Sequence, residues 1–484
     1  MTEKPSECSI SPSSFRDPSG TVYFLGGILY RQVNRSYSEH YDRLISSGLY
    51  ERLVGDGLLV PHEEAGLDQT VTDGAYRVIK PERVGFISYP YEWCFSQLKD
   101  AALCTLRIQK TCMEYGMSLK DASAYNIQFR KGRPLLIDTL SFEKYREGVP
   151  WVAYRQFCQH FLAPLALMAY RDARLSQLLR AYMDGIPLDL TSRLLPARTK
   201  ANPGLLMHIH LHATSQSFFS DKKVNLKGRF MGRASLMGLA DSLESTVKKL
   251  KWKPHDRGWA GYYEATNYAS GSMEAKKRLV QGYLAKVKPG VVWDLGANTG
   301  VFSRLAEGLG ARVVSMDSDH SCVEANYGEA KSGGLDVLPL VADLTNPSPD
   351  IGWENRERLS LIHRGPADAV LALALVHHLA LSNNLPLWKI ADFLQGIGDA
   401  LIIEYVPKTD SQAEGLLAMK GDIFPDYTQE AFEREFGKRY HILESTKVEG
   451  SERTLYLMRR TDAGDKRNVK KRKGCISTPH PSLR

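Results

Sequence analysis

Long apolar stretches are missing from this chain of 484 residues. No run of about 18 or more apolar residues occurs, so no membrane-spanning helix is expected. Residues 1–20 also lack an apolar core, which argues against a secretory signal and indicates a flexible start. Hydrophobic residues make up 43% and charged residues 24% of the chain, enough for ordinary globular cores. We expect a cytoplasmic protein with two or three domains.

Cysteine is sparse and scattered. The chain has 7 cysteines, and no two of them form a C-x-x-C pair. This pattern favours reduced thiols in a cytosol and indicates no zinc site. Three alternating histidines, His208, His210 and His212, would share one face of a strand but would spread around a helix. Because no cysteine or carboxylate sits beside them, we predict partly buried structural histidines and no metal.

Acidic residues are outnumbered, and the formal net charge is +8. Much of this excess lies in residues 466–473 of an expected basic tail, 463–484. We interpret the tail as solvated and disordered; the alternative is an arm that touches phosphate or anionic lipid. No aromatic residues interleave with these charges, so we expect no base stacking by the tail.

Residues 291–319 show the order strand, glycine-rich turn, helix, strand, acid. The apolar run 291–293 lacks helical spacing, which suits a buried parallel strand. Gly296 and Gly300 then supply a tight turn and allow the backbone to approach a ligand. A second apolar run ends at Asp317, whose carboxylate can accept hydrogen bonds from ribose hydroxyls. This order indicates a nucleotide site at the carboxyl edge of a doubly wound sheet.

The turn reads D-L-G-A-N-T-G, whereas a dinucleotide site would read G-x-G-x-x-G. An acid before the first glycine and glycines four apart resemble motif I of class I S-adenosylmethionine-dependent methyltransferases. A dehydrogenase-like site and an inactive copy are the alternatives. The resemblance implies S-adenosyl-L-methionine as cofactor. It implies that the cofactor is bound by Asp294, Gly296, Asn298, Gly300 and Asp317, and at its adenine by Asp343.

The same resemblance implies an α/β, Rossmann-like domain over residues 255–462, with seven strands and an antiparallel last strand. His377 and His378 follow the fourth strand, where this fold places substrate-facing groups. Imidazole can act as a base near neutral pH, so both are candidate catalytic residues; the alternative is a structural corner. An insert between the third and fourth strands carries Trp353, which is either a core residue or an acceptor-binding residue.

The combination DLGANTG, PSPDIGW, LALALVHHLA, IEYVPK and DIFPDY resembles a bacterial group that includes the nodulation protein NoeA. The resemblance implies methyl transfer but does not fix the acceptor. No N-P-P-[YF] motif follows the fourth strand, so we expect a small molecule or glycan as acceptor and no nucleic acid. A non-catalytic S-adenosylmethionine-binding protein is one alternative. A phosphotransferase with a regulatory C-terminal half is the other.

The N-terminal region, 21–190, is expected to be mixed α+β, with strands at 21–33 and 76–90 and a helix at 37–54. Asp121, Asn126 and Asp138 have the spacing of a kinase catalytic loop and its metal-binding Asp, and resemble protein kinases and aminoglycoside phosphotransferases. No His-Arg precedes Asp121, no glycine directly follows Asp138, and Lys80 is the only tempting phosphate lysine. We predict either a degenerate kinase-like fold without phosphoryl transfer or a hairpin with surface carboxylates. A helical linker or subdomain is expected over 191–254.

Overall fold

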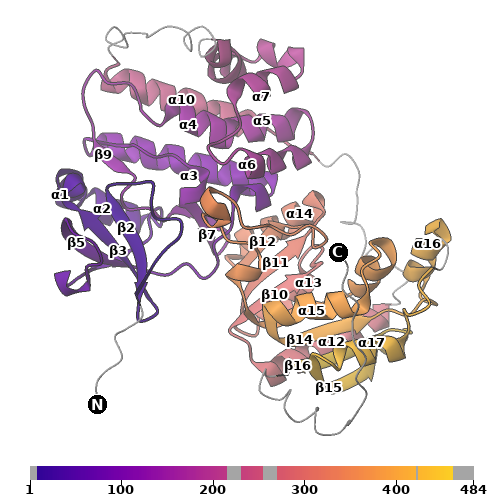
Figure 1. The fold of residues 1–484 in the computed structure, drawn as a ribbon. Coiled ribbons are helices and arrows are strands. Elements are labelled where there is room, and N and C mark those ends of the chain that lie inside the picture. The colour runs from indigo at the N-terminus through magenta and orange to yellow at the C-terminus, as the bar shows by residue number, and fades with distance from the viewer. Residues whose placement is uncertain (1–7, 215–230, 254–269, 421–422, 462–484) are drawn as a thin grey trace, which may run out of the picture. The chain divides into compact units, whose positions relative to one another are not determined.

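The computed structural model describes residues 8–214, 231–253, 270–420 and 423–461 (Figure 1). The predicted basic tail lies outside these ranges, and so do residues 1–7 of the predicted flexible start, 1–20. Spatial clustering divides the chain into two compact units. One comprises Met1–Thr266, Ala297–Glu307 and Arg312–Arg364, and the other Asn267–Gly296, Gly308–Ala311 and Gly365–Arg484. None of the helices in the described ranges has the length and apolar character needed to cross a bilayer.

An antiparallel five-stranded sheet opens the first unit. Its strands lie in the order β1 (Cys8–Ile10), β2 (Gly20–Leu25), β3 (Ile28–Asn34), β5 (Ala75–Pro81) and β4 (His62–Ala65). The predicted hairpin at 21–33 is confirmed as β2 and β3. The second strand predicted within 76–90 is wrong, because β5 ends at Pro81, which has no amide N–H to continue a ladder.

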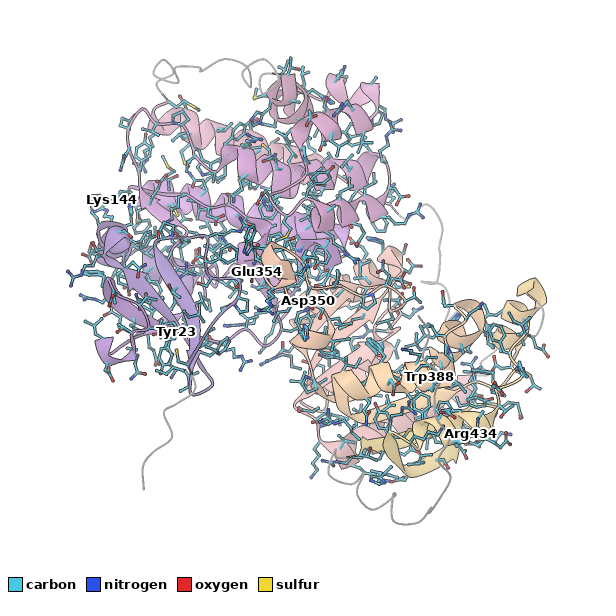
Figure 2. The ribbon with its side chains drawn as sticks, in the orientation of Figure 1. Tyr23, Lys144, Asp350, Glu354, Trp388 and Arg434 are labelled. Carbon is cyan, nitrogen blue, oxygen red and sulfur yellow. The ribbon has the colours of Figure 1, made fainter. Side chains whose placement is uncertain are left out.

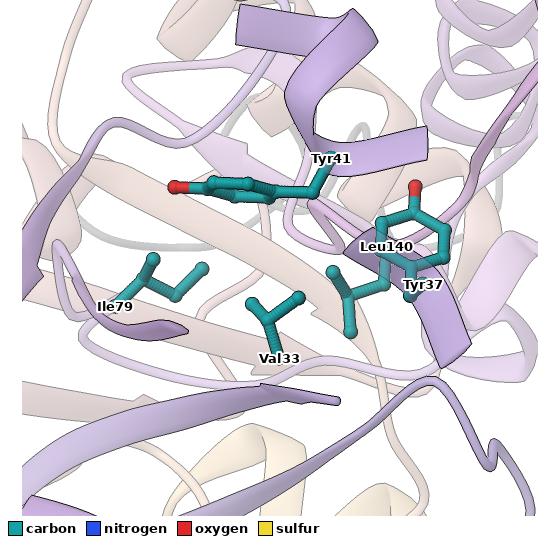
Figure 3. Close-up of a cluster of buried hydrophobic side chains, with 5 residues drawn as sticks. All are labelled: Val33, Tyr37, Tyr41, Ile79 and Leu140. Carbon is teal, nitrogen blue, oxygen red and sulfur yellow. The ribbon is translucent and has the colours of Figure 1, made fainter. Parts of the chain in front are cut away.

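Helices α1 (Ser38–Ser46) and α2 (Leu49–Gly55) connect β3 to β4. They replace the single predicted helix, because Gly48 between them has a left-handed φ of 77°. Side chains from β3, β5, the start of α1 and a later loop form one buried cluster (Figure 3). Its members are Val33, Tyr37, Tyr41, Ile79 and Leu140. The cluster therefore ties the sheet to the segment that carries Asp138.

The remainder of the first unit is mostly helical. Helix α3 (Phe95–Glu114) is followed by the pair β6 (Met117–Leu119) and β9 (Phe142–Lys144) and by the hairpin β7 (Ile127–Arg130) and β8 (Arg133–Leu136). Shorter helices follow: α4 (Tyr154–Phe157), α5 (Ala163–Tyr170), α6 (Leu178–Ala181), α7 (Leu188–Leu194) and α8 (Pro203–Leu205), then the longer α10 (Arg233–Lys249).

The three alternating histidines lie on a helical turn, not on a strand. His208 is buried between the Tyr154 hydroxyl at 2.8 Å and the Ser242 hydroxyl at 2.9 Å. His210 contacts the Ser192 and Thr199 hydroxyls in the same way. The ring nitrogens of both histidines therefore make hydrogen bonds between helical segments.

A seven-stranded sheet has the order β12-β11-β10-β13-β14-β16-β15. Its strands are β10 (Val291–Leu295), β11 (Arg312–Asp317), β12 (Val337–Val341), β13 (Ala367–Ala372), β14 (Gly398–Tyr405), β15 (Tyr440–Lys447) and β16 (Thr454–Arg460). In this sheet β16 runs antiparallel to both of its neighbours, β14 and β15. Counted along the chain the order is 3-2-1-4-5-7-6, so the predicted Rossmann-like fold with its antiparallel seventh strand is confirmed.

Helices flank these strands in each unit. In the first unit α13 (Val301–Glu307) and α14 (His320–Gly333) contact β11 and β12. In the second, α12 (Ser270–Val287) contacts β14, and α15 (Leu387–Ile397) contacts β13, β14 and α17 (Gln429–Phe436). Helix α16 (Ser411–Lys420) follows β14.

The insert between β12 and β13 belongs to the first unit and is fastened to the N-terminal region. Arg364 forms a buried pair with Glu92, with Nη2 2.5 Å from Oε1. The Tyr89 hydroxyl accepts a hydrogen bond from the Leu359 amide at 2.7 Å. Trp353 on this insert is 65% exposed, so its assignment to the core is wrong. The N-terminal region, rather than the sheet core, holds the insert in place.

Candidate functional site

The predicted cofactor turn leaves the carboxyl end of β10 with left-handed backbone. The φ values are 70° at Gly296, 51° at Asn298 and 78° at Gly300. Asparagine adopts this region more readily than most side chains, which explains its place between the glycines. The Asn298 amide donates to Oδ2 of Asp317 at 2.8 Å. The turn after β10 is thereby joined to the acid that ends β11, as the sequence order predicted.

The two glycines of the turn are required for different reasons. A β-carbon on Gly300 would lie 2.1 Å from Oδ1 of Asn326, whose Nδ2 donates to the Ser315 hydroxyl at 2.7 Å. Gly300 therefore lets the start of α13 pass against α14. A β-carbon on Gly296 would meet Leu375 at 3.3 Å. Its left-handed φ, more than crowding, excludes other residues there.

Asp317 is held by backbone amides from both sides. Oδ1 accepts from the Asp319 amide at 2.9 Å and Oδ2 from the Asn298 amide. Burial raises the pKa of Asp317, and these amide donors work against that rise. A backbone hydrogen bond from Ser318 also acts to lower the pKa of this carboxylate, which is therefore fixed by amides of the turn and of the residues that follow β11. The arrangement suits the predicted ribose contact.

Asp343 follows the next strand of the parallel pair. β11 and β12 are in register, with Asp317 opposite Val341. Asp343 is exposed, and its Oδ1 accepts hydrogen bonds from the amide and the hydroxyl of Thr345 at 2.8 and 2.7 Å. It therefore lies at the same strand edge as Asp317. Its adenine role stays a prediction.

A buried ion network in the second unit was missed by sequence reasoning. Nζ of Lys276 on α12 lies 2.7 Å from Oε2 of Glu404 at the end of β14. Arg453 lies 3.9 Å from that oxygen and 2.7 Å from Oδ2 of Asp410. Lys276 also interacts electrostatically with Asp294, the acid that precedes the turn. The five groups come from three separate stretches of the chain, so no local pattern marks them; a lysine inside an apolar helix face was the available signal.

The two histidines after β13 lie in different surroundings. The chain leaves the strand through Ala374, whose φ of 51° is strained for a residue with a β-carbon. His377 is fully buried, and neither ring nitrogen meets a hydrogen-bond partner among the described residues. Burial, with His378, Arg453 and Lys276 nearby, lowers the pKa of His377 well below 6.5. His378 is partly exposed, and burial and Arg453 lower its pKa as well. Only His378 has surface that an acceptor can touch.

Comparison with known proteins places the chain in a family. The nodulation protein NoeA of Rhizobium meliloti (strain 1021) is 35% identical over 457 residues, which cover 93% of this chain and 96% of NoeA. The chain belongs to the NoeA family. No protein-family model matches it.

Solved structures align with less than half of this NoeA-family protein. Magnesium protoporphyrin IX methyltransferase (ChlM) from Synechocystis PCC 6803, with bound SAM, is 15% identical and covers 42% of this chain and 89% of its own, with a TM-score of 0.30. N-methyltransferase NodS from Bradyrhizobium japonicum WM9 is 9% identical and covers 40% and 98%, with a TM-score of 0.31. At these scores the functional argument rests on the geometry of this NoeA-family chain.

The kinase-like residues of the N-terminal region do come together, but their oxygens are occupied. Arg31 on β3 lies 2.7 Å from Oδ1 of Asp138, which also accepts the Leu140 amide. The Ser141 hydroxyl donates to Oδ2 of Asp138 at 2.6 Å. The candidate phosphate lysine, Lys80, is half-exposed and pairs with Glu63. A guanidinium thus pairs with the carboxylate that the sequence suggested as a metal ligand, and Arg31 was missed because it lies about a hundred residues earlier in the chain.

Asp121 is similarly engaged. Its Oδ1 accepts from the Ser123 amide at 2.9 Å and from Nε2 of Gln156 at 2.8 Å. Burial and the charge of Asp138 raise the pKa of Asp121. Asn126 donates to the Ser141 hydroxyl at 3.3 Å. The polar groups of Asp121, Asn126 and Asp138 are thus hydrogen-bonded within the first unit. The kinase-like fold stays a prediction.

We expect Asp138→Asn, which keeps the acceptor oxygen, to leave methyl transfer unchanged. The wild-type protein should show no magnesium-dependent hydrolysis of ATP, because Arg31 and the backbone already occupy Asp138. Both are measured on the full chain, the first with labelled S-adenosylmethionine and cell extract. Magnesium-dependent ATP hydrolysis that Asp138→Asn abolishes would show this interpretation to be wrong.

Proposed function

We propose that this NoeA-family chain is an S-adenosylmethionine-dependent methyltransferase whose acceptor is a small molecule or glycan. The observation that carries the proposal is the left-handed turn 296–300, which follows an acidic strand end and whose Asn298 amide is bound to Asp317. A turn of this shape at the carboxyl edge of a parallel sheet leaves backbone and carboxylate groups for a nucleoside.

The charges near the turn agree with a cationic cofactor. Asp294, Glu404 and Asp410 supply three carboxylates, and Lys276 and Arg453 supply two cations. These five groups therefore carry one net negative charge. S-adenosylmethionine carries a positive sulfonium and an ammonium group, and a nearby carboxylate would stabilise either of them. The donor set thus fits this cofactor.

Methyl transfer asks little covalent help from the protein. The bound cofactor supplies an activated methyl group on sulfonium. The chain would hold the cofactor through the turn 296–300 and Asp317, and would exclude water by the apolar walls at Leu375 and Val376. His378 would take a proton from the acceptor or orient it, since its lowered pKa keeps the ring neutral near pH 7. His377, fully buried, would act as a positioning residue behind it.

We expect Gly296→Val to weaken S-adenosylmethionine binding by roughly tenfold or more. A β-branched residue at φ 70° costs about 1–2 kcal/mol, and 1.4 kcal/mol corresponds to a factor of ten. Titration calorimetry on the full chain measures the affinity.

Gly310→Val is the matched control for that variant. Gly310 has a φ of 94° and no atom within 4 Å of its β-carbon position, and it lies before β11, outside the turn. The same backbone strain is introduced there without touching the cofactor turn. Equal affinity in Gly296→Val and wild type, or an equal loss in both variants, would remove the basis of the proposed function.

A further inference from the structure

Trp353 lies at the tip of a short loop on the insert after β12. Hydrogen bonds in both directions between Ile351 and Arg358, each 3.0 Å long, close the base of this loop. Trp353 itself is 65% exposed. Asp343, ten residues earlier in the chain, follows the end of β12 at the edge where ligands bind in open parallel sheets. The loop therefore continues from the predicted cofactor edge.

The backbone of the tip is strained and held. The φ values are 88° at Gly352, 56° at Glu354 and 55° at Asn355. Residues with a β-carbon are strained in this region and persist there only where the surroundings enforce the conformation. Here the enforcing group is the buried carboxylate of Glu357, whose Oε2 accepts from the Trp353 amide at 3.2 Å.

Glu357 is in turn fixed by the N-terminal region. Arg16 donates to both of its oxygens, at 2.8 and 2.9 Å, and this bonding lowers the pKa of Glu357. The Arg358 guanidinium lies 4.6 Å from the centre of the Tyr125 ring. These contacts hold the strained loop in one conformation, and the exposed indole of Trp353 is therefore held in a fixed position.

Two further exposed aromatic residues adjoin the contacts of this loop. Phe15 is 51% exposed and precedes Arg16, whose guanidinium lies 5.1 Å from the Phe15 ring centre. Tyr182 is 39% exposed and precedes Met183, whose methyl carbon is 3.1 Å from the β-carbon position at Gly352. Three segments widely separated in sequence thus meet at this loop, and each of them carries an exposed aromatic residue.

The exposed charges there disfavour an anionic ligand. Glu354 (Figure 2) and Asp184 are exposed carboxylates, and Arg356 is an exposed cation. Arg16 is already bound to Glu357 and interacts with Asp184. Phosphate-rich ligands such as nucleic acid or anionic lipid need several free cations. Aromatic faces beside carboxylates instead suit a neutral ligand with both C–H faces and hydroxyl donors.

We propose that Trp353, with Phe15 and Tyr182, forms a binding surface for a neutral glycan. The C–H face of a sugar ring would pack on the indole, and its hydroxyls would donate to Glu354 and Asp184. The glycan's role as methyl acceptor rests on the proposed function, whereas its binding does not. This inference names the substrate class for the loop that begins at Asp343.

The test is binding of the full-length protein to an array of neutral oligosaccharides without S-adenosylmethionine. We expect at least one glycan to bind, and Trp353→Ala to weaken that binding roughly threefold to tenfold, the range for a stacked aromatic contact. Trp353→Phe should recover part of the loss. Trp388→Ala is the control, because Trp388 on α15 is also exposed, at 43%, and lies in the other unit (Figure 2).

A second variant separates the loop shape from the indole. A β-carbon on Gly352 would lie 2.5 Å from that of Glu357, so Gly352→Ala should shift the tip and weaken glycan binding while the tryptophan remains. No glycan bound by wild type, or equal binding by wild type and Trp353→Ala, would overturn the inference, as would a surface that binds only protein. Calorimetry with S-adenosylmethionine separates failure of this inference from failure of the proposed function. If the wild-type protein does not bind S-adenosylmethionine, the proposed function is contradicted, whereas the glycan inference is not.

Discussion

Lys276→Met should destabilise the protein by about 3–5 kcal/mol, because it removes the cation that pairs with the buried carboxylate of Glu404 at 2.7 Å. Glu404 is fully buried, and the guanidinium of Arg453 lies farther from its Oε2, at 3.9 Å. Burial lowers the pKa of Lys276 even though Glu404 works to raise it, which shows how costly this buried charge is. Urea or thermal unfolding of the full chain measures the loss.

Lys286→Met provides the matched control on the same helix. Lys286 pairs with Glu444 at 2.6 Å, but the two side chains are 55% and 39% exposed. Exposed pairs of this kind contribute about 0–1 kcal/mol. If the two variants lose the same stability, the network around Glu404 is not the buried support that we describe. Because Lys276 also interacts with Asp294, the loss of stability in Lys276→Met should be accompanied by weaker cofactor binding.

His378→Ala and Asp317→Ala should fail in different ways. His378→Ala should keep cofactor affinity and lower turnover about 100-fold if the imidazole acts as a base. Asp317→Ala should lose cofactor affinity by about 1–3 kcal/mol, the cost of removing a hydrogen-bonded buried carboxylate. Cofactor calorimetry and turnover at saturating cofactor, with thermal melts of each variant, separate the two effects.

Arg312→Ala is the control for the second of these variants. Arg312 begins the strand that Asp317 ends, and it pairs with Asp336 in an exposed position. Its removal should leave cofactor affinity unchanged.

If His378→Ala loses cofactor binding while turnover at saturation is unchanged, the acceptor does not lie after β13.

The pH dependence provides a further check on His378. A base must be neutral to accept a proton, and burial lowers the pKa of His378 below 6.5. The wild-type rate should therefore persist as the pH falls through 6.5 and be lost only below the lowered pKa. A rate that falls by half at or above pH 6.5 would indicate another base.

The sequence alone predicted the glycine-rich turn and the Rossmann-like sheet that contains it. Apolar runs too short for helices, a glycine-rich break and an acid at a strand end are local signals, and their order predicted the sheet that β10 to β16 form. The same local signals placed Asp317 next to the turn, because adjacent parallel strands end at the same edge. They also predicted the hairpin β2–β3, whose strands are neighbours in sequence and pair with each other.

Tertiary structure decided what depends on residues far apart in the chain. The sequence could not show that Arg31 occupies Asp138, that Lys276 and Arg453 share Glu404, or that Arg16 fixes the loop of Trp353. Each of these is a charge pair whose partners are separated by scores or hundreds of residues, and a charged side chain looks the same in sequence whether it is solvated or buried. Apolar periodicity reports which face of an element is buried, but the partner of a buried charge is chosen only when the elements pack.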